Sequence, residues 1–418
     1  MYKEITQCRI CGNNGLVSVL HLGEQYLTGV FPKSTAERIT CGPVEMVKCV
    51  GSDTQACGLL QMRQSYDLGE MYGQNYGYRS GLNSSMVAHL QEIVKKVLGV
   101  VPLSAQDIVL DIGSNDSTLL RSYPLMPGLK LVGMDPTGIK FKEYYPPHIQ
   151  LITDFFSAAS FNKNLGLKKA KIVTSIAMFY DLEDPLEFMR QIAGILDERG
   201  VWAFEQSYMP TMLSENAYDT ICHEHLEFYA LRQIKWMADR AGLKIIDIEL
   251  NKINGGSFFV VVAHHGSSIP EATAKITAIL QQEEKAGLNT LTPFQVFKDG
   301  VYHHRDLLCA KIKEIRSSGK KVFGYGASTK GNVILQWCGL TANDIPYIAE
   351  VNQDKFGSFT PGTNIPIISE AEARRMKPEY FLVLPWHFKE NIIARESEYL
   401  NSGGKFLFPL PKLEIVGR

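Results

Sequence analysis

Two segments far apart in the chain share one local pattern. The first reads DIVLDIGSNDSTLLRSY (107–123) and the second reads KKVFGYGASTKGNVILQW (320–337). In each, a short apolar run precedes a glycine-containing turn and a segment with helical spacing, which predicts a buried strand, a sharp turn and a helix. Further strand and helix patterns alternate around both segments, which is typical of a parallel, doubly wound sheet. The sequence therefore predicts an α/β protein with two doubly wound domains.

The first of these turns lacks the residues of a dinucleotide loop. Such a loop carries three closely spaced glycines, but here Gly113 stands alone and Asp111 ends the predicted strand over 108–112. A carboxylate is a poor neighbour for a pyrophosphate, whereas it suits a ligand with an ammonium group, such as S-adenosylmethionine. We expect the helix to begin at Ser117 or Thr118. An α/β domain without an adenosine ligand is the alternative.

Acidic residues that end later strands favour the same ligand. The strand predicted over 129–135 ends in Asp135, where a carboxylate can accept hydrogen bonds from both ribose hydroxyls. The segment LITDFF (151–156) supplies an acceptor and an apolar face for adenine. We therefore predict a cofactor site for S-adenosylmethionine made of Asp111, Gly113, Ser114, Asn115, Asp135, Pro136, Asp154, Phe155 and Ser175.

The second turn favours a phosphate. Its glycines follow the pattern G-x-G-x-x-x-x-G, one residue longer than a dinucleotide loop, and Lys330 lies at the start of the predicted helix. A strand that ends in Glu350 follows it. Helices predicted over 270–288 and 301–319 bridge the two domains, and we expect His303 and His304 there to be surface or packing residues.

A loop rich in tyrosine and glycine, residues 66–86, precedes the first domain. Its composition is typical of a loop that faces a substrate, and a packing surface between domains is the alternative. With the second turn, it predicts substrate-binding residues at Tyr78, Arg79, Gly326, Lys330, Asn332, Glu350, Asn352 and Lys355.

Five of the eight cysteines precede residue 58. Cys8 and Cys11 are spaced so that two thiolates can bind one ion, and Cys49 and Cys57 form a second, wider arm. Four thiolates in tetrahedral geometry are typical of structural zinc. We predict a structural Zn²⁺ site with these four metal ligands, with Cys41 in reserve; buried thiols without a metal are the alternative.

Charge and hydropathy limit the partners of the chain. The formal net charge is −1, so no global field attracts nucleic acid or an anionic membrane surface. The N-terminus lacks the apolar core of a secretory signal, and no run approaches the roughly 20 apolar residues of a membrane span. We expect a cytoplasmic monomer or homodimer without nucleic-acid or membrane partners.

The segment HEHLEFYA (223–230) leaves three interpretations open. His225 suits general base chemistry, because imidazole titrates near neutral pH. A metal site is weaker, because zinc-binding histidines on one helix face lie four residues apart, although His223 and His225 would share one face of a strand. A polar, hydrogen-bonded corner is the third interpretation.

Seven motifs together resemble one family. In order they are CRICG, YGYRSGLN, LDIGSND, AYDTICHEHLEF, NGGS, FGYGASTKGN and TPGTNIPI, and they span nearly the whole chain. The chain resembles the three-domain sugar C-methyltransferases of branched deoxysugar pathways. The resemblance implies a zinc-binding N-terminal domain (1–80), a central class I methyltransferase domain with a Rossmann-like fold (81–265) and a C-terminal Rossmann-like domain that holds a nucleotide-sugar (266–418).

The resemblance also implies an activity and a catalytic group. The substrate would be a nucleotide-linked 4-keto-6-deoxy sugar, methylated from S-adenosylmethionine at C-3 through an enolate. By motif position Glu224 and His225 match the catalytic pair, and Tyr76 matches a tyrosine directed at the sugar. His225 would remove the proton, Glu224 would bind a hydroxyl or tune the imidazole, and His223 or Tyr76 would donate to the enolate oxygen.

Two other functions remain open from the residues alone. A zinc-containing, NAD-dependent oxidoreductase would use the glycines of the second turn for nicotinamide dinucleotide. A zinc-ribbon adaptor would bind nucleic acid or protein without catalysis, but the near-neutral charge speaks against it.

Overall fold

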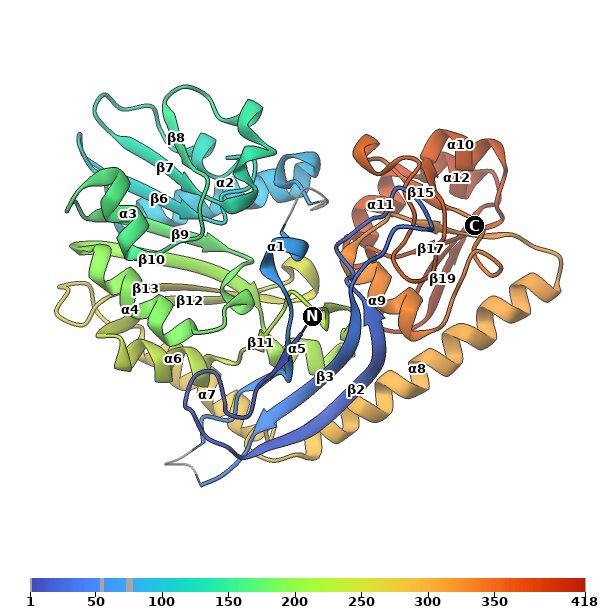
Figure 1. The fold of residues 1–418 in the computed structure, drawn as a ribbon, viewed down its shortest axis with the longest axis horizontal. Helices are drawn as coiled ribbons and strands as arrows, with labels where there is room; N and C mark the ends of the chain where they lie inside the picture. The colour runs from blue at the N-terminus through green and yellow to red at the C-terminus, as the bar shows by residue number, and fades with distance from the viewer. Residues whose placement is uncertain (1, 53–55, 73–77, 418) are drawn as a thin grey trace.

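A computed structural model describes residues 2–52, 56–72 and 78–417. Two α/β bodies lie side by side, and a long curved hairpin from the N-terminal region runs between them (Figure 1). The long helix α8 (Thr292–Ser317) passes below the hairpin toward the second body. In the part of the chain that is described, every helix is too short or too polar to cross a membrane.

The first body contains a seven-stranded sheet in the order β12-β13-β10-β9-β6-β7-β8. Its strands are β6 (Ile108–Ile112), β7 (Lys130–Met134), β8 (Ile149–Ile152), β9 (Ala170–Ile176), β10 (Leu196–Ser207), β12 (Leu243–Asn251) and β13 (Ser257–His264). The first five are parallel, as predicted, whereas β12 and β13 add an antiparallel edge. From β6 the chain runs outward to β7 and β8 on one side and then crosses to β9 on the other side of β6. Ligands of such sheets bind at this switch point.

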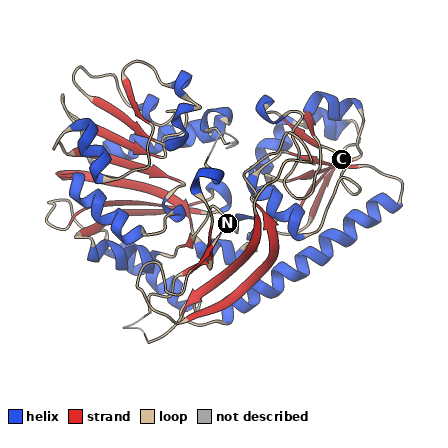
Figure 2. Ribbon diagram, in the orientation of Figure 1, coloured by secondary structure: helices blue, strands red, loops and turns tan. Residues whose placement is uncertain are grey.

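Helices cover both faces of this sheet (Figure 2). They are α2 (Ser84–Val100), α3 (Ala158–Leu165), α4 (Pro185–Ile195) and α6 (Leu231–Arg240). The start of α4 shows how the sequence sets a helix boundary: Asp184 accepts a hydrogen bond from the backbone N–H of Glu187 at 3.0 Å, and Pro185 occupies the first turn.

The helix predicted at Ser117 or Thr118 is wrong. Residues 113–119 form turns, and a short 3-10 helix, η2 (Leu120–Ser122), follows them. Asn115 and Ser117 have positive φ angles of 48° and 61°, which a right-handed helix does not allow. The loop after β6 is therefore longer and more irregular than the pattern indicated.

The second body contains a six-stranded sheet in the order β16-β15-β14-β17-β18-β19. Its strands are β14 (Val322–Tyr325), β15 (Ile348–Glu350), β16 (Ile367–Ser369), β17 (Tyr380–Val383), β18 (Lys405–Phe408) and the antiparallel β19 (Glu414–Gly417). Helices α9 (Thr329–Trp337), α10 (Glu370–Arg375), α11 (Lys389–Arg395) and α12 (Ser397–Asn401) pack with it, and α7 (Thr273–Lys285) and α8 precede it. This confirms the second α/β domain.

A four-stranded antiparallel sheet connects the N-terminal region to both bodies. Its order is β11-β4-β3-β2, from β2 (Leu16–Tyr26), β3 (Cys41–Cys49), β4 (Leu60–Met62) and β11 (Glu227–Phe228). The hairpin of β2 and β3 reaches the second body, where the backbone N–H of Tyr26 donates to Gln336 at 2.7 Å. Because β11 comes from the HEHLEFYA segment, that segment lies at the junction of all three parts.

Candidate active site

The four predicted metal ligands converge at one end of the N-terminal sheet. The sulfur atoms of Cys8, Cys11, Cys49 and Cys57 all lie within 4.8 Å of one another. The Cys8–Cys57 and Cys11–Cys49 sulfur pairs are each 3.5 Å apart. Tetrahedral zinc with Zn–S bonds of about 2.3 Å needs sulfurs about 3.8 Å apart, so the cluster fits the ion. Cys41 is exposed and is not part of the cluster.

The predicted cofactor loop follows β6 at the switch point of the first sheet. The Asp135 carboxylate accepts from the backbone N–H of Asn115 at 2.7 Å and from the amide and hydroxyl of Thr137 at 2.7 and 2.6 Å. A carboxylate has about four acceptor positions, so Asp135 keeps capacity for a ribose hydroxyl. Ser114 is hydrogen-bonded to the hydroxyl of Tyr145 at 2.8 Å, and Tyr145 is a residue that the sequence patterns missed.

Asp111 is the second-last residue of β6 and is buried beside the same loop. Thr174 donates its hydroxyl to this carboxylate at 2.6 Å. Burial raises the pKa of Asp111 to about 7; the Thr174 hydrogen bond lowers it, and the negative charge of Asp135 raises it further. A positively charged group bound here would stabilise the ionised carboxylate, so the loop fits a ligand that carries an ammonium or sulfonium charge.

The other predicted cofactor-binding residues differ in how far they are exposed to solvent. Pro136 begins the 3-10 helix η3 (Pro136–Ile139), directly after Asp135. Asp154 accepts from the hydroxyl of Ser160 at 2.7 Å, and Phe155 is 48% exposed. Ser175 is fully buried and accepts a hydrogen bond from the indole N–H of Trp202 at 2.9 Å, so its hydroxyl is directed into the core.

The residues before β11 form a turn, in which His225 is half-buried. The Nδ1 atom of His225 donates to the backbone oxygen of Thr220 at 2.6 Å, and the ring lies against Tyr180 with centroids 4.3 Å apart. Burial and then the positive charge of Lys330 lower the pKa of His225 to about 3, against a smaller opposite effect of the Thr220 oxygen. The imidazole is therefore neutral at pH 7, the form that a general base needs, but it is a weaker base than the free imidazole on which the sequence prediction relied.

Glu224 and His223 are directed at the N-terminal region. Glu224 is buried and accepts from the hydroxyl of Thr28 at 3.4 Å, and burial raises its pKa. A Cβ atom on Gly29 would lie 2.4 Å from Oε1 of Glu224, so a side chain at this position would displace the Glu224 carboxylate. His223 is fully buried and donates from Nε2 to the backbone oxygen of Gln25 at 3.2 Å.

The interpretation of HEHLEFYA as a metal site is wrong for the residues that the structure describes. Among them, the four cysteines are the only group of three or more possible ligands that converge. His223 and His225 bind oxygens of different structural elements because the chain turns between them rather than forming a strand. Tyr76, the other predicted catalytic residue, lies outside the described residues.

Two of the predicted substrate-binding residues, both in the second body, are directed at the surroundings of the HEHLEFYA segment. The Lys330 ammonium donates to the backbone oxygen of Asn254 at 2.9 Å, and its charge acts on His225. Asn332 donates to the backbone oxygen of Thr28 at 2.7 Å. Helix α9 also packs against η6 (Tyr218–Thr220), which precedes the turn of His225. The start of α9 thus lies against the segment that precedes His225.

The remaining predicted substrate residues surround the turn after β14. Glu350 accepts from the backbone N–H groups of Ala327 at 2.7 Å and of Val351 and Asn352 at 2.8 Å each. Lys355 donates to the backbone oxygen of Ala327 at 2.8 Å. Gly326 has a φ of 80°, and a Cβ atom there would lie 2.8 Å from the ring of Pro385.

A cleft of ≈ 370 Å³ lies between the two bodies. Arg79 and Asn352 line it, as do Lys140 and Tyr144, which the sequence patterns missed. The guanidinium of Arg79 stacks over the ring of Tyr144 at 4.4 Å and hydrogen-bonds to its hydroxyl. Tyr78, beside it, is exposed, and its backbone oxygen accepts from Asn115 at 3.2 Å. The cleft therefore adjoins the cofactor loop.

Known proteins match the chain over nearly its full length. Family models described as "Putative zinc binding domain", "Methyltransferase domain" and "C-methyltransferase C-terminal domain" match residues 8–72, 83–248 and 252–411. The C-methyltransferase NovU of Streptomyces niveus is 27% identical over 418 residues, with 99% of this chain and 97% of the relative covered. The chain belongs to the S-adenosylmethionine-dependent C-methyltransferases. Its cofactors are S-adenosylmethionine and the zinc of the four-cysteine cluster.

Two of the solved structures that match overlap this methyltransferase over less than half of its length. A S-adenosylmethionine-dependent methyltransferase from Clostridium acetobutylicum is 14% identical and covers 43% of this chain and 92% of its own, with a TM-score of 0.32. The plantazolicin methyltransferase BpumL, in complex with SAH, is 12% identical and covers 42% and 82%, with a TM-score of 0.34. Overlaps of this size carry no inference about function. The predicted domain boundaries stay predictions, since the family models delimit matched segments rather than folded units.

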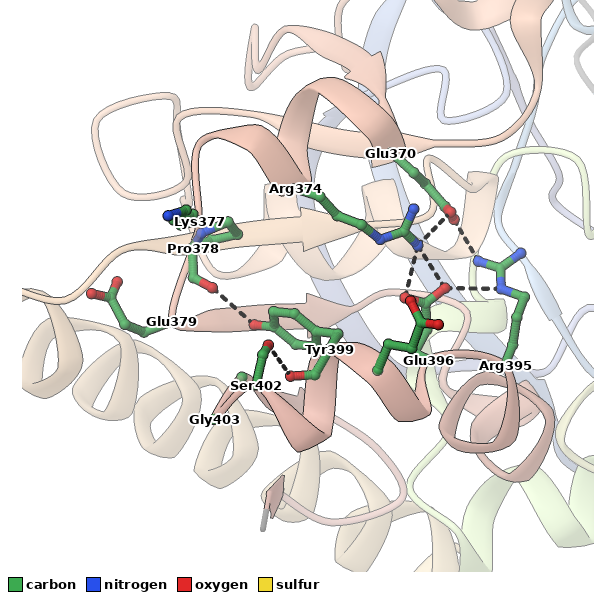
Figure 3. A pocket seen from close by; sticks show the side chains of 12 residues that line it. Glu370, Arg374, Lys377, Pro378, Glu379, Arg395, Glu396, Tyr399, Ser402 and Gly403 are labelled. Carbon is green, nitrogen blue, oxygen red and sulfur yellow. Dashed lines mark hydrogen bonds and ion pairs between the residues drawn. The ribbon is translucent and has the colours of Figure 1, made fainter.

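A cavity larger than this cleft lies away from the site. It measures ≈ 970 Å³ and lies on the second body, beside α10, α11 and α12 (Figure 3). Arg374 pairs there with Glu370 at 2.8 Å and with Glu396 at 2.7 Å, and Arg395 binds the same two glutamates. These charges neutralise one another, and no predicted site residue lines the cavity. The geometry therefore favours the junction around His225 as the active site.

Proposed function

We propose that this methyltransferase acts on a nucleotide-linked 4-keto-6-deoxy sugar and methylates it at C-3 through an enolate. The observation that carries the proposal is the hydrogen bond between His225 and the backbone oxygen of Thr220, which sets the tautomer of the ring. Its Nδ1–H is bound by the Thr220 backbone oxygen, which leaves Nε2 as the basic nitrogen. A carbon next to a ketone is acidic enough for such a base, and the resulting enolate is nucleophilic at carbon.

The surrounding charges suit an enolate. The positive charge of Lys330 keeps His225 neutral before reaction and would favour negative charge on a substrate oxygen near the same ring. Glu224, whose pKa burial raises, can donate to or accept from a sugar hydroxyl. Tyr76 remains a second candidate donor by motif position. When bound, S-adenosylmethionine supplies an electrophilic methyl group, and the loop after β6 and Asp135 would hold it.

The cleft between the two bodies suits the nucleotide diphosphate. Arg79 and Lys140 line it with positive charge from the first body, beside the acidic side chains of Glu143 and Asp354. The guanidinium of Arg79 and the ammonium of Lys140 can each bind a phosphate oxygen. The cleft therefore supports a substrate whose diphosphate is bound beside the cofactor loop by these two cations.

Turnover of keto-sugars tests the proposal. The purified protein is incubated with S-adenosylmethionine and a panel of nucleotide-linked keto-sugars, and the masses of the products are measured by mass spectrometry. A gain of one methylene on a 4-keto-6-deoxy sugar, with the new methyl at C-3 by NMR, is the expected result. Methyl transfer to another acceptor with every keto-sugar unchanged would contradict the proposal.

The zinc-containing oxidoreductase is the rival function, and the same purified protein addresses it. Denaturing mass spectrometry should release S-adenosylhomocysteine or S-adenosylmethionine, and release of NAD alone would favour the rival. A cytoplasmic location and a monomeric or homodimeric state are part of our proposal; light scattering would test the assembly.

A further inference from the structure

Arg9 lies between the zinc ligands Cys8 and Cys11, and its side chain is only 2% exposed. Its guanidinium donates to the backbone oxygen of Met62 at 2.5 Å and to the hydroxyl of Ser65 at 2.8 Å. Its own backbone N–H donates to Gln61 at 3.1 Å. The zinc loop is thereby tied to strand β4 and the residues that follow it.

Glu227 lies on the other side of the same guanidinium. Its side chain is 0% exposed, and Oε1 lies 3.7 Å from Nε of Arg9. Within the described parts of the chain, neither of its oxygens has a hydrogen-bond partner, and nor does Nε of Arg9. Burial raises the pKa of Glu227 well above its usual range, and the positive charge of Arg9 is the largest effect that lowers it. A buried carboxylate is unfavourable unless a positive charge lies close by, so the ionised form of Glu227 depends on Arg9.

Backbone hydrogen bonds continue from this pair to the catalytic turn. Glu227 pairs with Gln61 across β11 and β4. The Met62 N–H donates to the oxygen of Leu226 at 2.8 Å, and the Leu226 N–H donates to the oxygen of Tyr180 at 2.8 Å. Leu226 directly follows His225, so strand β4 and Tyr180 hold the catalytic turn from two sides.

We propose that Arg9 and Glu227 form a positioning pair that couples the zinc loop to the segment carrying Glu224 and His225. The role of that segment in catalysis rests on the proposed function; the coupling itself rests on the contacts of Arg9. In the zinc-bound protein the fixed loop holds the guanidinium between β4 and the carboxylate of Glu227. Loss of zinc frees the loop, weakens the charge pair and loosens the turn of His225.

A nearby carboxylate supplies the matched control. Oε2 of Glu183 lies 3.5 Å from the same Nε atom of Arg9, but the Glu183 side chain is 52% exposed. Exposed ion pairs contribute little to stability, because water and salt screen them. Glu183→Gln should therefore change neither the backbone of residues 221–229 nor catalysis, although it touches the same guanidinium.

Hydrogen exchange followed by mass spectrometry tests the coupling in the full-length protein, with zinc content measured by atomic spectrometry. We expect Arg9→Met to speed exchange of the peptide spanning 221–229 about tenfold, while strands of the second body keep wild-type exchange. Removal of zinc from the wild type by 1,10-phenanthroline should have the same local effect. Arg9→Lys keeps the charge and should restore part of the protection, and Glu183→Gln should match the wild type.

Glu227→Gln keeps the shape of the side chain, so it is available if Arg9→Met does not fold. It should make exchange of residues 221–229 independent of zinc, since the charge pair is absent in both states. The coupling is wrong if zinc removal leaves this exchange unchanged in the wild type, or if Arg9→Met and Glu183→Gln behave alike. Hydrogen exchange is measured without turnover, so it tests the coupling separately from the proposed function. The coupling can be wrong even if His225 is the base, and it can be right even if His225 is not the base.

Discussion

The Nδ1 atom of His225 lies 2.6 Å from the backbone oxygen of Thr220. A backbone oxygen can only accept, so Nδ1 carries the ring proton and Nε2 carries the lone pair. Thr220 ends η6, and α9 of the second body packs against η6. The orientation of the base therefore depends on the docking of the two α/β bodies, and not on local sequence alone.

Replacing the base should separate chemistry from cofactor binding. His225→Asn should lower methyl transfer by about 10²–10⁴-fold, because a positioned base contributes roughly that factor. The affinity for S-adenosylmethionine, measured by calorimetry, should stay close to wild type, because the cofactor loop follows a different strand.

His223→Gln is the matched control for that experiment. His223 binds the backbone of Gln25 in the N-terminal sheet, so this variant should lose stability in thermal unfolding but keep its turnover per folded molecule. Full activity of His225→Asn, or equal loss of turnover in both variants, would show that the base is misassigned.

Removing the charge of Lys330 should raise the pKa of His225. Burial and Lys330 together hold this pKa at about 3, and a positive charge disfavours the imidazolium. In Lys330→Met the pKa, followed by NMR of the ring protons, should move toward the ordinary value of about 6.5. Lys313→Met, on an exposed position of α8, should leave it unchanged. An unaltered titration in Lys330→Met would place the lysine too far from the ring to matter.

Affinity for S-adenosylmethionine should rise with pH through about 7. Burial raises the pKa of Asp111 to that value, and only the ionised carboxylate attracts the ammonium or sulfonium group. Protonation at lower pH therefore weakens binding, by about tenfold between pH 8 and pH 6 for a pKa near 7. In calorimetry Asp111→Asn should bind more weakly and show a flat profile, whereas Asp107→Asn, at the other end of the strand, should keep the slope. A flat wild-type profile would contradict this role of Asp111.

Loss of one zinc ligand should remove the metal and destabilise the protein. Cys57→Ser should hold less than one zinc per chain and unfold at lower temperature, since structural zinc contributes directly to folding. Cys41→Ser is the control, because Cys41 is exposed and outside the cluster. Zinc content and thermal unfolding are measured on both. Stoichiometric zinc in Cys57→Ser, or its loss in Cys41→Ser, would mean that the ligand set is different.

Local patterns were enough to predict some features of the molecule. The spacing of Cys8 and Cys11 and the wider arm of Cys49 and Cys57 identified the zinc ligands. A largely apolar run identified β6, whose five residues, Asp111 included, are all buried. Such features depend on neighbours along the chain, or on residue types with few alternative uses. They can therefore be predicted without knowledge of the fold.

Contacts between distant segments could not be predicted from those patterns. Lys330 matched a phosphate-binding position, but the docking of α9 directs it to Asn254 and places its charge near His225. His223 and His225 look equivalent in sequence, yet the turn sends them to Gln25 and Thr220. Ser117 matched a helix start, but its positive φ belongs to a loop shaped by Asp135 and Tyr144. In each case tertiary structure decided what the side chain contacts.

Exchange of the substrate hydrogen tests the central claim most directly. The protein is incubated in D₂O with a nucleotide-linked 4-keto-6-deoxy sugar and S-adenosylhomocysteine, and NMR follows the hydrogen on the carbon next to the ketone. The account predicts rapid loss of that hydrogen with the wild type and a rate lower by about 10²–10⁴-fold with His225→Asn. Exchange at the wild-type rate in His225→Asn, or retention of the hydrogen by a wild-type protein that methylates the same sugar, would contradict it.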